Sequence, residues 1–531
     1  MMNEDFVLPA FENTRVLNFA ESGDRQKMER ALADVHSKLG QTYRLEDATI
    51  ITQRNQNCNP SFNPAQIDQV VGYVEYANLE QSLTALDKVH RYSKTWKKTE
   101  AKTRIQLVEK LADILEAKRF ELSAWMVFEV GKNWREADAD VCEAIDFCRY
   151  YARQMLKLSK PHLTQVLSGE RDELSYHPKG VGLVIAPWNF PLAILTGMTV
   201  ASLVSGNATL FKPAEQSSVI GAMLARAIKE AGFPEGSFYF LAGEGEKIGP
   251  SLVADERVDV IAFTGSASVG LSIIETAAKK PGAHQRGVKK VIAEMGGKNA
   301  VIVDEDADID EAILGCVHSA FSFQGQKCSA LSRLLVHENV YDSFVSRFVE
   351  AAKTLRMGPG ANPENQLGPV IDSESQTRIE KTIAEAEKRL KLLYKKTDLP
   401  TGGHFVPLAI FETQDTKDPI FQNEIFGPVV VIKKIRSLEE GFADVNSVRY
   451  ALTGGIYSRS PSHIERAKRE MEVGNLYINR SITGAVVERH PFGGFKLSGI
   501  GSKAGGPDYL YQFLEPRTYS ENTVRRGFAG D

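Results

Sequence analysis

The sequence is poor in cysteine and has no excess of basic charge. Only five of its 531 residues are cysteines, and no two of them form a CxxC pair. Such a sparse, odd set predicts reduced thiols in a cytoplasmic protein and excludes a disulfide scaffold. Lys and Arg number 64 against 68 Asp and Glu, a net charge of −4, so nothing favours nucleic-acid binding. Hydrophobic residues at 43% and charged residues at 25% exclude intrinsic disorder.

The sequence also lacks a clear targeting or membrane segment. Its start, MMNEDFVLPAF, has neither the basic nor the apolar part of a signal peptide. The stretch between Lys179 and Lys212 carries no charge and is long enough to suggest a membrane helix. However, Pro187 and Pro191 would break such a helix, and GVGLVIA before them is β-rich. We therefore expect a buried strand, a non-helical turn and a helix from about Leu192, with no membrane association.

Strands and helices alternate along two parts of the chain. Apolar spacing before them predicts three helices, over residues 103–118, in the segment that ends at Gly131, and over 138–155. From Gly180 to Glu294, apolar runs such as ATLFK and VIAFT each precede a helical segment. This alternation predicts a parallel sheet that is covered on both faces. A second α/β series begins near Gly296, and the chain beyond about Pro507 is predicted to be extended.

Two segments at strand ends are candidates for binding a nucleotide, although no GxGxxG follows the first strand. In VDVIAFTGSASVG, Gly265 and Gly270 surround a strand-to-helix turn that can hold one phosphate, or that is simply a tight turn. In FKPAE, Lys212 and Glu215 end a strand at the edge where parallel sheets bind ligands. Both can engage ribose hydroxyls. The alternative is a solvated lysine.

Three further residues are candidates for catalysis. Cys328 in SFQGQKCSA has a polar setting, and we expect Lys327 and the first turn of a helix to lower its pKa. Cys316, in an apolar helical pattern, is predicted to be a core residue. Glu294 at a strand end is a candidate general base or an edge glutamate. Asn189 in PWNFP can donate to an oxyanion or can satisfy its own turn.

These weak signals occur in an informative order. PWNFP, FKPAE, FTGS, EMGGKN, GQKCSA, EIFGP and PFGGFKLSG follow one another along the chain. The series closely resembles the aldehyde dehydrogenase superfamily, from about Val71 onward. The resemblance implies that Cys328 attacks the aldehyde carbon and that Glu294 activates the water that hydrolyses the thioester. It also implies that the Asn189 amide and the Cys328 backbone N–H hold the oxyanion.

The resemblance further implies an NAD cofactor. Lys212 and Glu215 would hold the adenosine ribose, Ser266 a phosphate, and Glu424 the nicotinamide ribose. The full set of expected cofactor positions is Ile185, Ala186, Pro187, Trp188, Lys212, Ala214, Glu215, Gly245, Thr264, Gly265, Ser266, Val269, Met295, Gly296, Glu424 and Phe426. NAD is favoured over NADP because Glu215 would repel a 2′-phosphate. No metal is expected.

The implied fold class is α/β, with the aldehyde dehydrogenase architecture. It has a Rossmann-like NAD domain with a parallel sheet, an α/β catalytic domain and a small unit of oligomerisation strands. The expected boundaries are 1–158 and 179–295 for the NAD domain with its helical layer, 296–505 for the catalytic domain, and 159–178 with 506–531 for the strands. Such strands join a partner's sheet, so a homodimer or larger homo-oligomer is implied.

Within the superfamily, FSFQGQKCSA together with ITGAVVERHPFGGFKLSGIGSKAGGPDYL is similar to the Δ1-pyrroline-5-carboxylate dehydrogenases. These enzymes oxidise L-glutamate γ-semialdehyde to L-glutamate, the second step of proline catabolism. The 531 residues leave no room for an additional proline-oxidising barrel of about 250 residues, so a monofunctional form is expected. A separate proline dehydrogenase is then a transient partner.

The substrate positions implied by this resemblance surround the nucleophile. They are Glu143, Phe190, Lys327, Ser329, Gly484, Ala485 and Phe492. Ser329 and the N–H groups of Gly484 and Ala485 would bind the α-carboxylate, Glu143 the ammonium, and Phe492 the aliphatic part. Some family members carry serine in place of Ala485. Two alternatives stay open: a dehydrogenase for another carboxylated aldehyde such as succinic semialdehyde, and a silent protein that reuses the fold.

Overall fold

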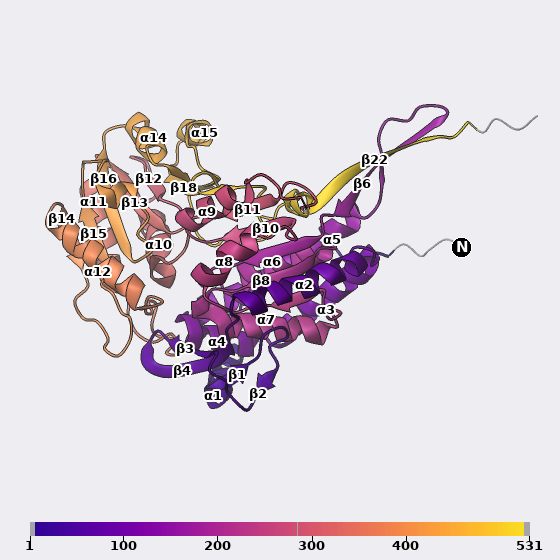
Figure 1. The fold of residues 1–531 in the computed structure, drawn as a ribbon. Coiled ribbons are helices and arrows are strands. Elements are labelled where there is room, and N and C mark those ends of the chain that lie inside the picture. Colours follow the sequence, from indigo (N-terminus) through magenta and orange to yellow (C-terminus); the bar gives the residue numbers. More distant parts are fainter. Residues whose placement is uncertain (1–5, 284, 525–531) are drawn as a thin grey trace, which may run out of the picture.

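The computed structural model describes residues 6–283 and 285–524 (Figure 1). A six-stranded sheet, in the order β21-β11-β10-β7-β8-β9, forms the centre of the first half. Its strands are β7 (Val181–Ile185), β8 (Ala208–Lys212), β9 (Phe238–Phe240), β10 (Val260–Thr264), β11 (Lys290–Glu294) and β21 (Gly499–Ile500). All pair in parallel except β21, which is antiparallel to β11. The parallel sheet predicted between Gly180 and Glu294 is therefore confirmed.

Helices cover both faces of this sheet. Those that connect its strands are α6 (Ala193–Val204), η1 (Glu215–Ser217), α7 (Ser218–Ala231), α8 (Gly245–Ala254) and α9 (Ala267–Ala277). Those that precede it are α2 (Leu79–Trp96), α3 (Ala101–Ala117), α4 (Arg119–Val130) and α5 (Trp134–Leu158). Helix α4 ends where Gly131 adopts a left-handed conformation with φ +69°, as its position predicted. Helix α5 starts earlier than predicted because the Asn133 side chain accepts from the Glu136 N–H and caps it.

Residues 6 to about 80 carried no clear sequence pattern, but the structure places secondary structure among them. They form α1 (Ser22–Lys38) and a four-stranded sheet in the order β2-β1-β4-β3. The strands are β1 (Gln41–Tyr43), β2 (Ile50–Ile51), β3 (Cys58–Asn63) and β4 (Gln66–Glu75). Cys58, which has a polar sequence context, begins β3. Such short strands owe their stability to packing on the helical layer, which local propensity does not reveal.

A second sheet of seven strands lies in the other half, in the order β14-β15-β16-β13-β12-β18-β19. Its strands are β12 (Asn299–Val303), β13 (Leu331–His337), β14 (Lys391–Lys395), β15 (Ala409–Glu412), β16 (Val429–Ile435), β18 (Thr453–Tyr457) and β19 (Asn475–Ile478). The accompanying helices are α10 (Ile309–Phe321), η2 (Ser322–Gly325), α11 (Tyr341–Lys353), α12 (Ser373–Glu387), α13 (Pro419–Gln422), α14 (Leu438–Asn446) and α15 (Pro461–Glu470). Cys316 is fully buried on α10, as predicted. A separate hydrophobic core fills each face of this sheet.

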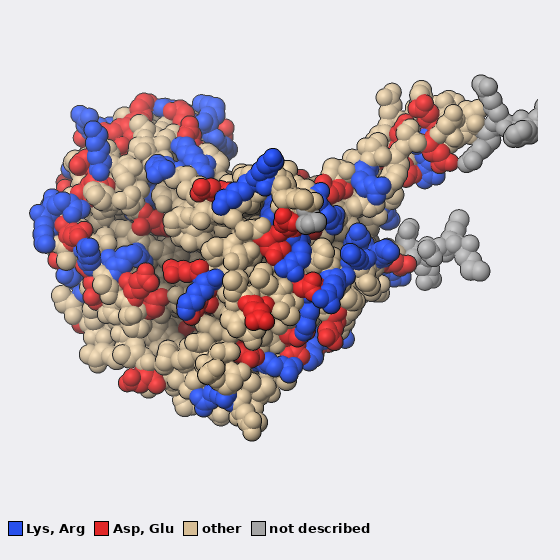
Figure 2. Space-filling model, viewed as in Figure 1, with Lys and Arg blue, Asp and Glu red and all other residues tan. Residues whose placement is uncertain are grey.

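Two small strand units complete the fold. One pairs β17 (Tyr450–Ala451) with β20 (Phe495–Lys496). The other is an arm of β5 (His162–Leu163), β6 (Glu170–Pro178) and β22 (Leu514–Asn522) that projects from the body (Figures 1 and 2). The chain before β22 was predicted to be extended, but Tyr509–Phe513 forms the short helix η3 and buries most of its side chains.

The arm and the two large sheets fit the predicted division into domains, which stays a prediction. Strand β21 comes from the part assigned to the catalytic domain and nevertheless completes the first sheet. The ends of the outer ranges, 1–5 and 525–531, lie outside the described residues. Within the described part, no helix is long and apolar enough to span a bilayer. Basic and acidic side chains intermingle on the face seen in Figure 2.

Candidate active site

A cavity of about 510 Å³ lies where the two sheets meet. Its wall is formed by α5, the PWNFP turn, the ends of β10 and β11, the Cys328 loop and the segment 484–487. Cys328 and Glu294 both line this cavity, although three elements, β12, α10 and η2, separate them along the chain. Every residue predicted to bind substrate lines it as well: Glu143, Phe190, Lys327, Ser329, Gly484, Ala485 and Phe492.

Cys328 lies in a turn between η2 and β13, not in the first turn of a helix. The prediction of a lowered thiol pKa was wrong. Burial, together with the nearby Glu424 and Glu294 carboxylates, raises the pKa of Cys328 to about 12. Lys327 offers no compensation because its ammonium points to Glu136 at 2.7 Å. The sulfur of this structure is therefore a neutral thiol at neutral pH.

The loop that carries Cys328 is shaped by left-handed residues. Phe323 and Gln324 have φ +48° and +56°, and Gly325 follows with φ +68°. Such a run is costly for non-glycine residues, and hydrogen bonds hold it in place. The Gln324 amide donates to the Pro369 carbonyl at 2.7 Å, and the Ile371 N–H donates to the Gln326 side chain at 3.0 Å. The chain reversal brings the thiol into the cavity.

Asn189 supports the same loop. Its Nδ2 donates to the Gln326 carbonyl at 3.0 Å, and the side chain is buried. The amide nitrogen carries a second hydrogen, so this contact leaves one donor for another acceptor. The hydrogen bond of the Asn189 amide thus goes to the nucleophile loop and not to its own turn. The role as a donor to the oxyanion stays a prediction.

Glu294 ends β11 with its carboxylate buried. Its Oε2 has no hydrogen-bond partner among residues 6–283 and 285–524, and burial raises its pKa well above the ordinary value. Two glycines make room for it: a Cβ on Gly493 would lie 2.9 Å from Oε1 and one on Gly499 3.3 Å from Oε2. A carboxyl group with a raised pKa in a cavity is a typical general base or acid.

The residues predicted for the adenosine ribose converge at the carboxyl ends of β8 and β9. The Lys212 ammonium lies 3.1 Å from Glu215 Oε1, and the Gly245 N–H donates to the same oxygen. A Cβ on Gly245 would lie only 3.3 Å from that oxygen, so the glycine allows the approach. A cation and a carboxylate at a sheet edge fit a pair of ribose hydroxyls.

The expected phosphate and nicotinamide positions are also preorganised. Ser266 caps α9, where its hydroxyl accepts from the Val269 N–H at 3.3 Å. Glu424 accepts from the Gly297 N–H at 2.9 Å, and a Cβ on Gly296 would collide with its carboxylate. Phe426 packs edge-to-face on Trp188, with ring centroids 5.7 Å apart. These donor and acceptor positions fit a dinucleotide that extends from β8 to the cavity.

The substrate end of the cavity holds polar groups that lack protein partners. Within the part of the chain that the structure describes, no hydrogen bond forms to the Ser329 hydroxyl, the Gly484 and Ala485 N–H groups or the Glu143 carboxyl. Burial and the nearby Asp140 raise the pKa of Glu143 to about 8. Ser329 is buried, Glu143 and Ala485 are half-buried and Gly484 is exposed, so all four groups line the cavity with hydrogen-bonding capacity that a ligand can use.

The N-terminal segment 13–16 was not predicted, yet it closes one side of the cavity. Two buried carboxylates of α5 hold this segment, which runs across the helix. The Thr14 N–H donates to Asp146 at 2.7 Å, and the Leu17 N–H donates to Asp138 at 2.8 Å. Acidic residues eight positions apart share a helix face, so the spacing of this pair was the available signal.

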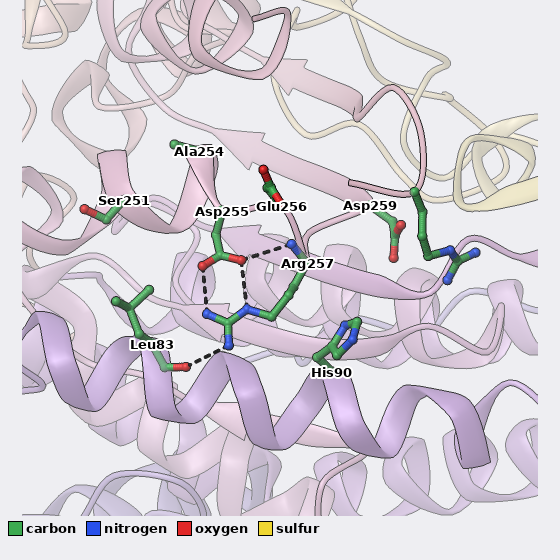
Figure 3. A pocket seen from close by; sticks show the side chains of 9 residues that line it. Leu83, His90, Ser251, Ala254, Asp255, Glu256, Arg257 and Asp259 are labelled. Carbon is green, nitrogen blue, oxygen red and sulfur yellow. Dashed lines mark hydrogen bonds and ion pairs between the residues drawn. The ribbon is translucent and has the colours of Figure 1, made fainter. Parts of the chain in front are cut away.

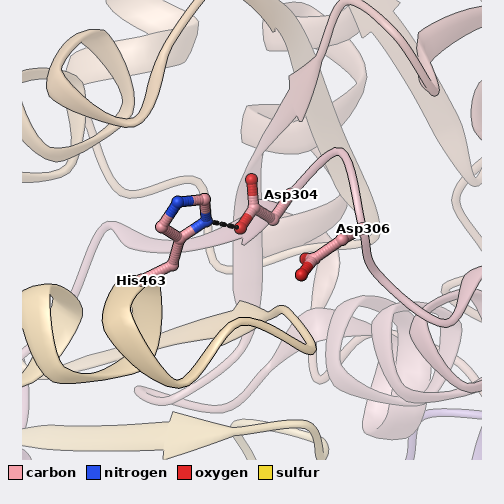
Figure 4. Close-up of side chains that lie close together, drawn as sticks. All are labelled: Asp304, Asp306 and His463. Atoms are coloured by element: carbon pink, nitrogen blue, oxygen red, sulfur yellow. Dashed lines mark hydrogen bonds and ion pairs between the residues drawn. The ribbon is translucent and has the colours of Figure 1, made fainter.

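Two polar groups lie elsewhere. A surface hollow beside α2 contains Arg257, which is fixed by a bidentate contact to Asp255 (Figure 3). At the end of β12 that is opposite Asn299, His463 Nδ1 and Asp304 Oδ2 are 2.7 Å apart, with Asp306 nearby (Figure 4). The Asp306 carboxylate accepts a hydrogen bond from the Ser458 hydroxyl at 2.9 Å. Neither group adjoins Cys328.

Comparison with known proteins agrees with this geometry. The sequence matches the aldehyde dehydrogenase family over residues 51–519. It is 40% identical to 1-pyrroline-5-carboxylate dehydrogenase 1 of Halalkalibacterium halodurans over 97% of this chain and all of that protein. It is 43% identical to the 1-pyrroline-5-carboxylate dehydrogenase of Bacillus pumilus over 95% of this chain and 98% of that one.

Solved structures give the same result. The NAD-bound 1-pyrroline-5-carboxylate dehydrogenase from Thermus superposes with a TM-score of 0.94 at 41% identity, covering 97% of this chain and all of that one. Proline utilization A from Bdellovibrio bacteriovorus superposes with a TM-score of 0.95 at 50% identity. The match covers 98% of this chain and 54% of that longer protein. The predicted fold class is confirmed, and the chain belongs to the aldehyde dehydrogenase family.

Proposed function

We propose that this protein oxidises L-glutamate γ-semialdehyde, which forms from Δ1-pyrroline-5-carboxylate, to L-glutamate with NAD. The observation that carries the proposal is the set of unpartnered polar groups in the Cys328 cavity. Relatives of 40–43% identity named 1-pyrroline-5-carboxylate dehydrogenase support it. The NAD-bound Thermus relative and the convergence of Lys212, Glu215 and Gly245 support the cofactor.

The chemistry begins at the thiol. Cys328 loses its proton to water, and its sulfur forms a bond to the aldehyde carbon while the π bond of the carbonyl breaks, so that the carbonyl oxygen becomes an alkoxide. The second N–H of Asn189 and the Cys328 backbone N–H stabilise that charge. When bound, NAD supplies the acceptor for the hydride that leaves this carbon. A thioester on Cys328 remains.

Glu294 completes the turnover. Its buried carboxylate takes a proton from a water molecule, whose oxygen bonds to the thioester carbon while the sulfur–carbon bond breaks. The thiolate regains a proton, and glutamate leaves. The lack of a partner for Oε2 leaves this oxygen available to the water.

The remote end of the substrate sets the specificity. Ser329 and the N–H groups of Gly484 and Ala485 offer donors to the α-carboxylate. Glu143 offers a carboxylate to the ammonium, and Phe492 covers the aliphatic chain. Substrate binding then favours ionised Glu143, so affinity rises with pH up to the pKa of about 8.

Kinetics with NAD and three aldehydes test the substrate assignment. We expect kcat/KM for pyrroline-5-carboxylate to exceed that for propanal by a factor on the order of a thousand, because hydrogen bonds to charged groups contribute about 1.5–3 kcal/mol each. Succinic semialdehyde should fall between them. Ser329→Ala should raise KM for pyrroline-5-carboxylate about tenfold and leave propanal kinetics unchanged. Similar values for all three aldehydes would reject this substrate and leave the family assignment standing.

We also propose that the protein is a homodimer or larger homo-oligomer. The arm of β5, β6 and β22 exposes most of β22 away from the body, which suits pairing with a second copy (Figure 1). Light scattering after size-exclusion chromatography tests this, and a chain that remains monomeric when concentrated would contradict it. The five free cysteines agree with a cytoplasmic location. A separate proline-oxidising enzyme would supply the substrate.

A further inference from the structure

The carbonyl groups around Cys328 are held by one side chain. Asn299, the first residue of β12, is 2% exposed. Its Nδ2 donates to the Cys328 carbonyl at 2.7 Å and to the Ala330 carbonyl at 2.8 Å. Its Oδ1 accepts from the Thr453 N–H at 3.0 Å. Both hydrogens of this amide nitrogen are thus donated to the nucleophile loop.

The surrounding backbone adapts to this contact. The pairing of β12 with β13 shifts register between Asn299 and Ala300, a bulge that redirects a side chain. Gly297 lies against the same carbonyl, and a Cβ there would come within 2.7 Å of the Cys328 oxygen. The Thr453 hydroxyl donates to the Ser329 carbonyl at 3.2 Å. Three successive carbonyls of the loop are therefore fixed from the starts of β12 and β18.

Fixing the Cys328 carbonyl also fixes the opposite side of its peptide unit. A peptide bond is planar and trans, so its C=O and its N–H point in opposite directions. The carbonyl of Cys328 points to Asn299, and the N–H of the same unit belongs to Ser329. That N–H is the donor that opposes the unfavourable effect of burial on the Cys328 thiolate.

We propose that Asn299 is a positioning residue for the nucleophile: by holding the Cys328 and Ala330 carbonyls, it fixes the loop from which the sulfur faces the cavity. The inference rests on the proposed role of Cys328. Asn299 is not among the residues that line the cavity, and it contacts Cys328 at the backbone carbonyl, so its effect on the reaction is exerted through the backbone of the loop.

Asn207 provides a matched control. It is fully buried, its Nδ2 donates to the carbonyls of Ser202 and Phe513, and its Oδ1 accepts from the Gly180 N–H. It therefore makes the same three kinds of bond at the other end of the first sheet. Asn299→Ala and Asn207→Ala should cost similar stability, and only the first should alter the thiol.

The decisive measurement is the pH dependence of alkylation of Cys328 by iodoacetamide, quantified on its peptide by mass spectrometry. In Asn299→Ala we expect the rate at pH 8 to fall about tenfold, since the loop no longer holds the sulfur and the neighbouring Ser329 N–H in their orientation. kcat should fall by a similar factor, with KM for NAD unchanged. Asn299→Ser, which keeps one hydroxyl donor, should lie between the variant and the wild type. Asn207→Ala should leave alkylation and kcat unchanged.

Thermal melts monitored by circular dichroism report folding. If Asn299→Ala does not fold, Asn299→Ser carries the test, and an unchanged alkylation profile in a folded Asn299 variant would overturn the proposal. Equal losses in Asn207→Ala would overturn it too. Cys328→Ala separates this inference from the proposed function: turnover that survives in Cys328→Ala rejects the nucleophile. If turnover is lost there while alkylation of Asn299→Ala is normal, only the positioning role is rejected.

Discussion

The two large sheets present opposite edges to the cavity. From the first sheet, functional residues come at the carboxyl ends of strands: Ile185 ends β7, Lys212 ends β8, Thr264 ends β10 and Glu294 ends β11. From the second sheet they come at the amino ends: Asn299 starts β12, Cys328 and Ser329 precede β13, Glu424 precedes β16 and Thr453 starts β18. The cavity thus lies between the carboxyl edge of the first sheet and the amino edge of the second.

The comparison shows that one general rule finds only half of this site. Ligands of parallel sheets bind at the carboxyl edge, and that rule identifies Lys212 and Glu294 from the sequence. At the amino edge the useful groups are backbone N–H donors. The Gly297 N–H donates to the Glu424 carboxylate, and the Ser329 N–H lowers the pKa of the Cys328 thiol against the larger effect of burial. Donors of this kind suit groups that are or become anionic.

The strongest test of the amino edge is removal of the nucleophile. Cys328→Ala should lower turnover by a factor on the order of 10⁴ or more, because no sulfur remains to form the covalent intermediate. NAD binding, measured by calorimetry, should remain within about twofold, since the adenosine positions lie at the carboxyl edge. Cys316→Ala, in the core of α10, serves as the matched control and should retain turnover. Near wild-type activity in Cys328→Ala would refute the assignment.

The carboxyl edge is tested next by Glu294→Gln. We expect a rapid burst of NADH followed by a steady state slower by about 10²–10⁴, because only thioester hydrolysis needs this base. In the wild type, the raised pKa of Glu294 means that its basic form is populated only as pH increases. Steady-state turnover should therefore rise with pH, and the variant should lose that dependence. Stopped-flow absorbance measures both phases. A proportional loss of burst and steady rates would assign Glu294 another role.

The smallest effect concerns the cofactor at the far end of the carboxyl edge. Glu215→Gln should raise the ratio of kcat/KM with NADP to that with NAD about tenfold, because one repulsive charge near a 2′-phosphate is removed. The Lys212 ammonium, 3.1 Å from Glu215 in the wild type, would remain available to the phosphate. Initial rates with both cofactors measure the ratio. An unchanged ratio would separate Glu215 from the ribose site.

Several features followed from the sequence. The strands Val181–Ile185 and Val260–Thr264 matched apolar runs, and the helix after the PWNFP turn begins at Ala193, one residue from the predicted start. The motifs that resemble the aldehyde dehydrogenases identified Cys328, Glu294 and the predicted substrate positions, all of which line the cavity. Other features had no local signature. The segment 13–16 is held at the cavity by groups distant in sequence, among them Asp138 and Asp146 of α5.

The sequence by itself determined the order of strands and helices, the family, and which thiol and carboxylates are the candidates for catalysis. These properties depend on short-range periodicity and on residue types at fixed spacing. Only the tertiary structure decided the electrostatics of the thiol. Lys327 is adjacent in sequence but turns to Glu136, whereas burial, and after it Glu424 from a distant loop, raises the pKa of Cys328. Charge interactions depend on distance and burial in space, and the chain order specifies neither.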